Sequence, residues 1–184
     1  MTHRKPLSDS QRTMLNNLTR EMFQTETSAA RHSRREADRY ENAPPSIALR
    51  AVATHAERVL LQLPEVAQRN DLIFSKGGMV VGELFSQGRD KLADMLIDCE
   101  RSYRGTLLGM RHGIDVFRLL QEFADTINNY ELRDFAKAWL EERIPLVQQV
   151  DEQLRWFAEN PETAIGPGGF IAPRIRSVSR LFAH

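Results

Sequence analysis

Hydrophobic residues recur three or four positions apart along much of this chain, and the longest such run occupies residues 81–107. This spacing places its members on one face of a helix, which we expect over residues 79–110. The run consists of Val81, Phe85, Gly88, Leu92, Met95, Cys99, Ser102 and Thr106, with Leu84, Leu96, Tyr103 and Leu107 beside them. Because an apolar helix face must pack against other elements, the run predicts a helical bundle.

Three further amphipathic segments complete a predicted four-helix bundle. They cover residues 46–68, 114–128 and 131–159. A turn is expected at Arg111-His112-Gly113, because glycines weaken the long helix there, and another at Asn128-Asn129. Pro145 lies in the middle of the last segment and is expected to kink it. Helices joined by short turns are typical of an all-α bundle, so this is the predicted fold class.

The two ends of the chain differ from the bundle in composition. Residues 1–43 are predicted to form a partly helical N-terminal arm outside the core, with a short helix over 8–24 capped by Ser8 or Ser10. The segment over 30–42 is charged on every face, which is typical of a solvent-exposed helix. Residues 44–162 are predicted to form the bundle. Residues 163–184 are predicted to form a Gly/Pro loop and a basic tail.

Length and composition indicate one soluble domain. The chain has 184 residues, of which 41% are hydrophobic and 27% charged, as in ordinary globular proteins. Its single cysteine, Cys99, excludes an intramolecular disulfide. No run approaches the roughly 18 apolar residues of a membrane span, and the N-terminus lacks the apolar stretch of a secretory signal. We therefore expect a cytoplasmic protein without a membrane span.

The net charge of zero conceals a division along the chain. Residues 46–162 hold fourteen Lys and Arg against nineteen Asp and Glu, whereas residues 163–184 hold three arginines and no acid. A nucleic-acid-binding domain needs a basic face on its folded body, so this distribution does not favour nucleic acid as a partner. The basic ends are suited to an acidic surface instead, including that of the same protein.

Candidates for metal or redox chemistry are Glu100 and His55. Di-iron bundles use Glu-x-x-His motifs, and no Glu in this chain is followed by His three residues later. His55 lies on an apolar face, where a lone histidine is typically a hydrogen-bonded core residue. Glu100 is expected to pair with Arg104 or Arg101 on the helix surface, beside an inward Tyr103. The sequence therefore predicts no cofactor.

Two sets of residues are candidates for protein contacts. Gly105, Gly109 and Gly113 lie four positions apart, so they form a bare strip that allows a close helix crossing within the bundle or across a dimer. A loosened connection would explain the same glycines. In the C-terminal tail, basic and apolar residues alternate, notably Arg174, Arg176, Arg180 and Phe182. Such segments dock into grooves or onto acidic surfaces, and this one is suited either to a partner or to its own body.

Three segments resemble a ferritin-like bundle of the small bacterial kind. They are Leu92–Arg104, Phe117–Phe123 and Ala138–Arg143. The resemblance implies a bundle fold, and Glu100 matches one ligand position of that family, although the Glu-x-x-His partner is missing. The function predicted from the sequence is that of a non-catalytic interaction or adaptor protein, which contacts a partner or a second copy. The alternative is a ferritin-like metal- or redox-linked protein with a non-standard core site.

Overall fold

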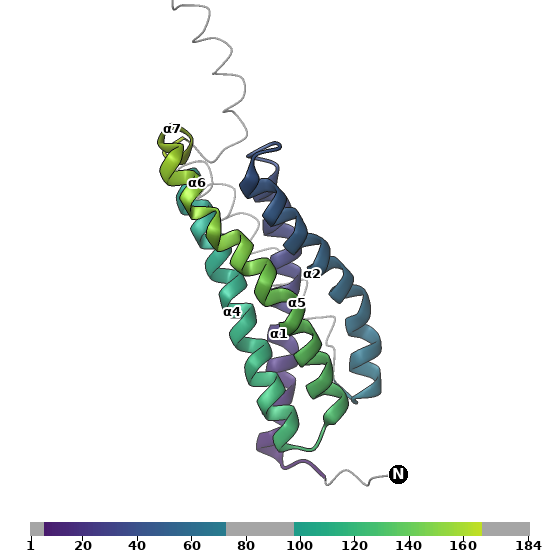
Figure 1. Ribbon diagram of the computed structural model, residues 1–184. Coiled ribbons are helices and arrows are strands. Elements are labelled where there is room, and N and C mark those ends of the chain that lie inside the picture. The colour runs from purple at the N-terminus through teal and green to yellow at the C-terminus, as the bar shows by residue number, and fades with distance from the viewer. Residues whose placement is uncertain (1–5, 73–97, 167–184) are drawn as a thin grey trace, which may run out of the picture.

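The computed structural model describes residues 6–72 and 98–166, and every element within those ranges is a helix. Four long helices pack against one another, which confirms the predicted all-α bundle (Figure 1). The helices are α1 (Asp9–Ala37), α2 (Pro44–Arg69), α4 (Cys99–Thr126), α5 (Tyr130–Glu152), α6 (Leu154–Glu159) and α7 (Pro161–Ala164).

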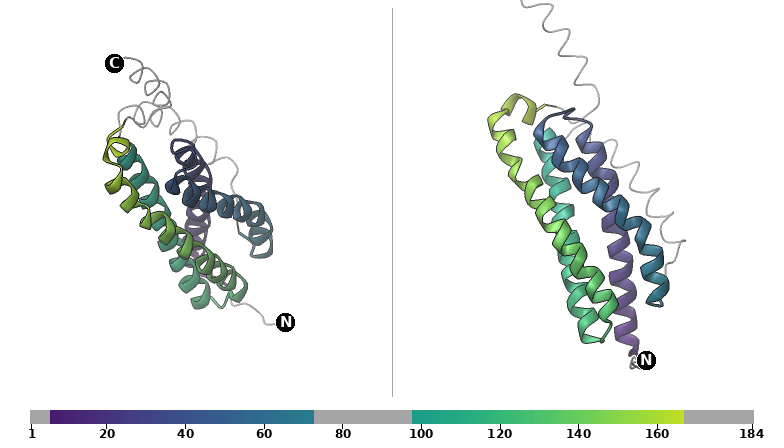
Figure 2. Two further views of the ribbon diagram at one scale, coloured as in Figure 1. Left: turned by 45° about the horizontal axis from the view of Figure 1, so that its top comes forward. Right: turned by 45° about the vertical axis from the view of Figure 1, so that its right-hand side comes forward.

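The four long helices form two closely packed pairs. α1 packs against α2, and α4 packs against α5, while α1 and α4 join the pairs along their length (Figures 1 and 2). The contact between α2 and α5 is the smallest of the four. α1 and α4 run in opposite directions, so the N-terminal half of α1 lies beside the C-terminal half of α4.

α1 shows that the predicted N-terminal arm outside the core is wrong, because residues 9–37 form one of the bundle's long helices. It begins at Ser8, whose hydroxyl accepts a hydrogen bond from the Gln11 backbone in a capping box. It then continues through the charged segment to Ala37. Its buried residues are Leu15, Leu18, Thr19, Met22, Glu26, Ala29, Ala30, Ser33, Glu36 and Ala37. Polar and small residues make up much of this face, so hydrophobic patterning alone does not reveal it.

α4 passes without a break through residues 111–113, where a turn was expected. A glycine inside a helix costs only about 1 kcal/mol relative to alanine. Burial of Leu107 and Met110 before this point, and of Ile114 and Phe117 after it, favours a continuous helix. The predicted helix over 79–110 lies partly outside the described residues and is seen only from Cys99 onward.

The turn between α4 and α5 forms as predicted. Asn128 adopts a left-handed conformation with φ 56°, and the Asn129 side chain accepts a hydrogen bond from the Leu132 backbone at 3.2 Å. Pro145 lies inside α5 and does not end it. The single helix predicted over 131–159 is instead interrupted after Glu152, and α6 continues from Leu154.

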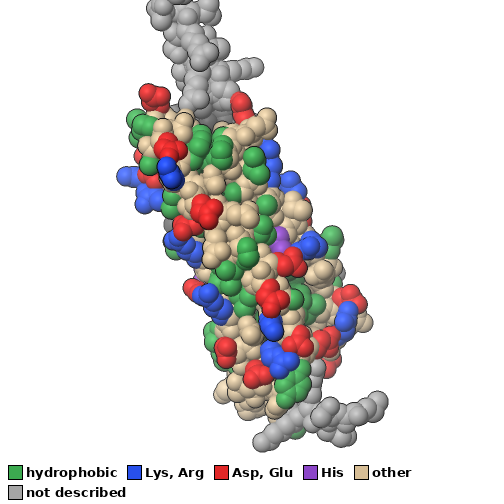
Figure 3. Space-filling model, viewed as in Figure 1, with side chains coloured by type: hydrophobic (Ala, Val, Ile, Leu, Met, Phe, Trp, Pro, Cys, Tyr) green, Lys and Arg blue, Asp and Glu red, His purple; other side chains and the backbone are tan. Residues whose placement is uncertain are grey.

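The buried apolar side chains of the described helices form one core. On the face seen in Figure 3, acidic and basic side chains are scattered among apolar and uncharged areas. None of the helices in the described ranges is long and apolar enough to cross a membrane.

The predicted Gly/Pro loop and basic tail over residues 163–184 are described only in part. Thr163 and Ala164 belong to α7, and Gly166 is the last described residue. The rest of the predicted loop and tail lies outside the described residues.

Candidate functional site

An ion pair lies inside the bundle, between Arg143 of α5 and Glu26 of α1. Both side chains are only 1% exposed, and Arg143 Nη2 donates to Glu26 Oε2 at 2.6 Å. Removing two charges from water is costly, so a buried pair of this kind requires close geometry and further hydrogen-bond partners. His55 supplies such a partner to Arg143, whereas Glu26 Oε1 has no hydrogen-bond partner among the described residues.

His55 of α2 and Trp139 of α5 complete what we call the core cluster: Glu26, His55, Trp139 and Arg143. Arg143 Nε donates to His55 Nδ1 at 3.0 Å, which makes the imidazole a neutral acceptor at that nitrogen. The guanidinium carbon lies 4.8 Å from the centre of the Trp139 ring, a cation–π contact. The indole stacks on Phe117 of α4, with ring centres 3.7 Å apart. All four long helices therefore meet at this cluster.

The environment of the core cluster shifts its pKa values in opposite directions. Burial raises the pKa of Glu26 to about 7, while the charge of Arg143 lowers it. The Trp139 indole N–H, which lies near that carboxylate without reaching normal hydrogen-bond geometry, lowers it further. Burial also lowers the pKa of His55 to about 4, and the Arg143 charge acts in the same direction. Both groups therefore favour their neutral forms more than they would in water.

These shifts predict that two opposing contributions to stability cancel between about pH 4.5 and 6.5. The pKa of Glu26 is raised in the folded state, so its contribution is present below pH 4.5 and is lost as pH rises to about 7. The pKa of His55 is lowered, so its contribution is present above pH 6.5 and is lost as pH falls to about 4. Within its own pH interval, each group changes the free energy of unfolding by about 1.4 kcal/mol per pH unit, and we call this change its slope.

Single variants should separate the two slopes in urea unfolding measured across pH. Glu26→Gln should leave the His55 slope, so that stability falls more steeply than in the wild type as pH drops from 6.5 to 4. His55→Asn should leave the Glu26 slope, so that stability falls as pH rises from 4.5 to 7. Parallel curves for the wild type and both variants would contradict the assigned pKa values.

A second polar cluster connects the end of α1 to the start of α4. Glu36 Oε2 accepts hydrogen bonds from Arg39 at 2.6 Å and from Ser102 at 2.8 Å. Tyr40 Oη lies 2.5 Å from Glu36 Oε1 and 3.1 Å from the Cys99 carbonyl oxygen. Burial, followed by the Glu36 charge, raises the pKa of Tyr40. These contacts join secondary-structure elements, so we assign the cluster a structural role.

The candidates Glu100 and His55 are engaged in separate contacts. Glu100 accepts from Arg104 Nε at 2.6 Å, the surface pairing expected from the sequence. His55 is a hydrogen-bonded core residue, as its position on an apolar face suggested. Within residues 6–72 and 98–166, no three His, Cys, Asp or Glu side chains converge in a way that could hold a metal ion.

The sequence analysis missed Glu26, Trp139 and Arg143 as members of one site. A signal was present for two of them, because Glu26 and Arg143 each lie three or four positions from apolar residues on the same helix face. Their pairing was not visible, since residues 9–37 were expected to lie outside the core.

The three glycines of α4 have different surroundings. A Cβ atom at Gly113 would lie 3.6 Å from Thr25 Cβ of α1 and 3.9 Å from Trp139, which are ordinary van der Waals distances. Gly105 and Gly109 are exposed, and no described atom would lie within 4 Å of a Cβ at either position. Arg174, Arg176, Arg180 and Phe182 lie outside the described residues.

Comparisons with known proteins identified no relative of this chain. No family model, no curated protein and no solved structure matches the chain. The resemblance to ferritin-like bundles stays a prediction.

Proposed function

We propose that the protein is a non-catalytic helical bundle that binds another protein or a second copy of itself, and that α4 supplies the contact surface. The observation that carries this proposal is Leu108, which is 67% exposed in the middle of a long helix. Gly105 and Gly109 lie three positions before it and one after it, and neither has a side chain to limit the approach of a partner. We call these three residues the α4 outer face.

Charged side chains surround the α4 outer face. Arg104 pairs with Glu100 at 2.6 Å, and Arg111 pairs with Asp151 at 2.5 Å. An apolar centre with a polar rim is the usual organisation of a protein interface. The backbone of a partner helix could approach closely at the glycines while its side chains pack around Leu108.

The ionisable side chains of the bundle interior support a non-catalytic role. Glu26, His55 and Arg143 are buried, and Arg143 donates to both Glu26 Oε2 and His55 Nδ1, which holds the three side chains inside the bundle. No contact within the described ranges favours the metal-linked alternative, because Glu100 is bonded to Arg104 and His55 is bonded to Arg143.

The test is a single substitution on the α4 outer face of the full chain. Leu108→Glu should weaken association at least roughly tenfold, because buried central residues dominate interface energies. The thermal stability of the Leu108→Glu variant should match that of the wild type, since the Leu108 side chain is exposed. The measurements are quantitative affinity capture from the native host and sedimentation equilibrium of the purified chain.

Leu61→Glu provides the matched control. Leu61 is 83% exposed and lies on α2, away from the proposed surface. This variant should retain the captured protein and the association state of the wild type. Identical behaviour of the wild type and both variants would overturn the assignment of α4 as the contact surface.

A further inference from the structure

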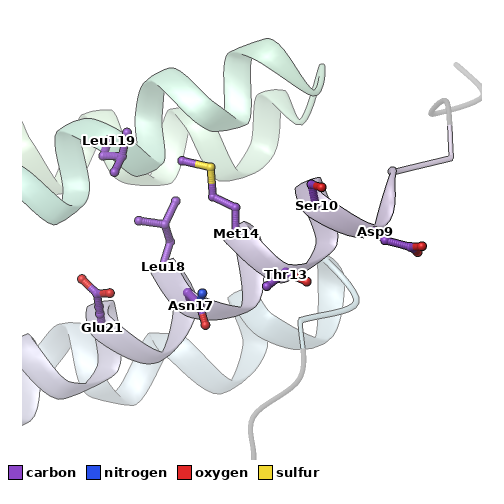
Figure 4. Close-up of a pocket in the computed structure, with 8 residues that line it drawn as sticks. All are labelled: Asp9, Ser10, Thr13, Met14, Asn17, Leu18, Glu21 and Leu119. Atoms are coloured by element: carbon purple, nitrogen blue, oxygen red, sulfur yellow. The ribbon is translucent and has the colours of Figure 1, made fainter.

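A shallow groove lies between the N-terminal half of α1 and α4 (Figure 4). Its lining residues are Asp9, Ser10, Thr13, Met14, Asn17, Leu18, Glu21 and Leu119. Met14, Leu18 and Leu119 supply the apolar part, and Leu119 is 47% exposed. An open apolar groove with a polar rim is suited to an extended or helical peptide segment.

The charge of the groove indicates which kind of segment it would accept. Asp9 and Glu21 lie toward its two ends, and none of its lining residues is basic. Of the arginines beside lining residues in the sequence, Arg118 pairs with Asp115 at 3.5 Å, and Arg20 donates to the Asn17 amide at 3.2 Å. The groove is therefore complementary to a segment that carries both apolar and basic side chains.

The chain itself contains a segment of this composition, within reach of the groove. The Gly166 carbonyl accepts from the Cys99 backbone at 3.0 Å, so residues 167–184 start beside the first residue of α4. Leu119 lies about 30 Å further along that helix, at 1.5 Å per residue. Residues 167–184 can span at most about 60 Å. About half of that reach is needed to arrive at Leu119, which leaves residues 176–184 available for the groove itself.

We propose that residues 176–184 occupy the α1–α4 groove of the same molecule. The apolar side chains of this segment, Val178, Leu181 and Phe182, would cover the apolar part of the groove, and its arginines, Arg176 and Arg180, would face the two acids. The covalent connection gives the segment an effective concentration in the millimolar range, which a second copy does not reach at ordinary protein concentrations. The contact is separate from the α4 outer face, because Leu108 does not line the groove.

Disulfide trapping in the full chain tests this contact. Asn17→Cys places a thiol on the groove rim, and Ala183→Cys places one beside Phe182. Under mild oxidation, this pair should form a disulfide within one chain, seen as a cross-linked monomer and mapped by mass spectrometry. The native Cys99 is buried and is identified in the same map.

The matched control is Gln148→Cys with Ala183→Cys. Gln148 is exposed on α5, close to Val150, whose carbonyl contacts Tyr103 near the start of α4. A segment that did not dock would reach this nearer position more readily than the groove. We expect the Asn17 pair to form its disulfide roughly tenfold faster than the control pair, because docking raises the local concentration of the Ala183→Cys thiol at the groove. Equal or slower formation, or disulfides between two chains, would overturn the proposal.

An exchange of charges between the groove and the segment tests the proposed pairing of arginines with the acidic rim. In the Asn17 and Ala183 cysteine background, Glu21→Lys should slow disulfide formation, and Arg180→Glu added to it should restore the rate. A rate that does not change with either substitution would contradict the pairing of arginines with the acidic rim. Neither result depends on Leu108, so failure here is distinguishable from failure of the proposed function.

Discussion

Replacement of Arg143 by methionine is expected to lower the free energy of unfolding by about 3–5 kcal/mol at pH 8. The substitution removes the only cation that contacts the Glu26 carboxylate within the described core, while the carboxylate stays buried. It also removes the hydrogen bond to His55 and the cation–π contact with Trp139. An unpaired buried charge is among the most destabilising changes a core can undergo.

The loss should depend on pH in a definite direction. The Arg143 charge lowers the pKa of Glu26, so in the methionine variant that pKa rises above its wild-type value of about 7. At pH 5.5 the carboxyl group is then protonated, and the destabilisation becomes smaller than at pH 8. Denaturant unfolding of the wild type and the variant at both pH values measures the difference.

The control for this prediction is the double variant Glu26→Gln with Arg143→Met. It removes both charges, so most of the stability lost in the single variant at pH 8 should return. An equal loss at pH 8 and pH 5.5, without recovery in the double variant, would show that the ion pair is not the source of the effect.

Tyr103→Ala is expected to lower the free energy of unfolding by about 3–5 kcal/mol, because it leaves a large cavity in the core. The side chain is fully buried, and its ring centre lies 4.8 Å from that of Phe157. Its hydroxyl donates to the Val150 carbonyl at 2.8 Å, in the last turn of α5. Tyr103 therefore connects α4 to the end of α5 and to α6.

Two variants separate the contributions of the ring and the hydroxyl. Tyr103→Phe keeps the ring and should cost only about 1 kcal/mol for the lost hydrogen bond. Tyr130→Ala removes a tyrosine that is half exposed at the start of α5, and it should change stability by about 0.5 kcal/mol or less. If Tyr103→Phe destabilised as strongly as Tyr103→Ala, the hydroxyl rather than the packing of the ring would be the main contribution.

The core cluster also limits how the helices can be arranged. Arg143 reaches Glu26 on α1 and His55 on α2 at the same time, at 2.6 Å and 3.0 Å. Sliding either helix by one turn, about 5.4 Å, would break its bond and leave the arginine without that partner. Apolar side chains alone tolerate such shifts more readily, because their contacts are not directional.

The sequence alone determined the parts of this protein that depend on local pattern. The apolar spacing in residues 46–68 predicted α2, and the run after Asn128-Asn129 predicted the start of α5, with the turn formed by those asparagines. The all-α class followed from the same periodicity. The burial of His55 was also predictable from its position on an apolar helix face, and the pairing of Glu100 with Arg104 was predictable from their spacing of four residues within one helix.

Only the tertiary structure decided that residues 9–37 belong to the core, that α4 continues through Gly113, and that Glu26 meets Arg143. On α1, buried polar residues such as Glu26 and Ser33 resemble surface residues until their partners are known. On α4, packing on both sides of Gly113 outweighs the low helix propensity of glycine. The ion pair joins residues far apart in the chain, and the contacts that offset the cost of removing its charges from water exist only after the helices have packed together.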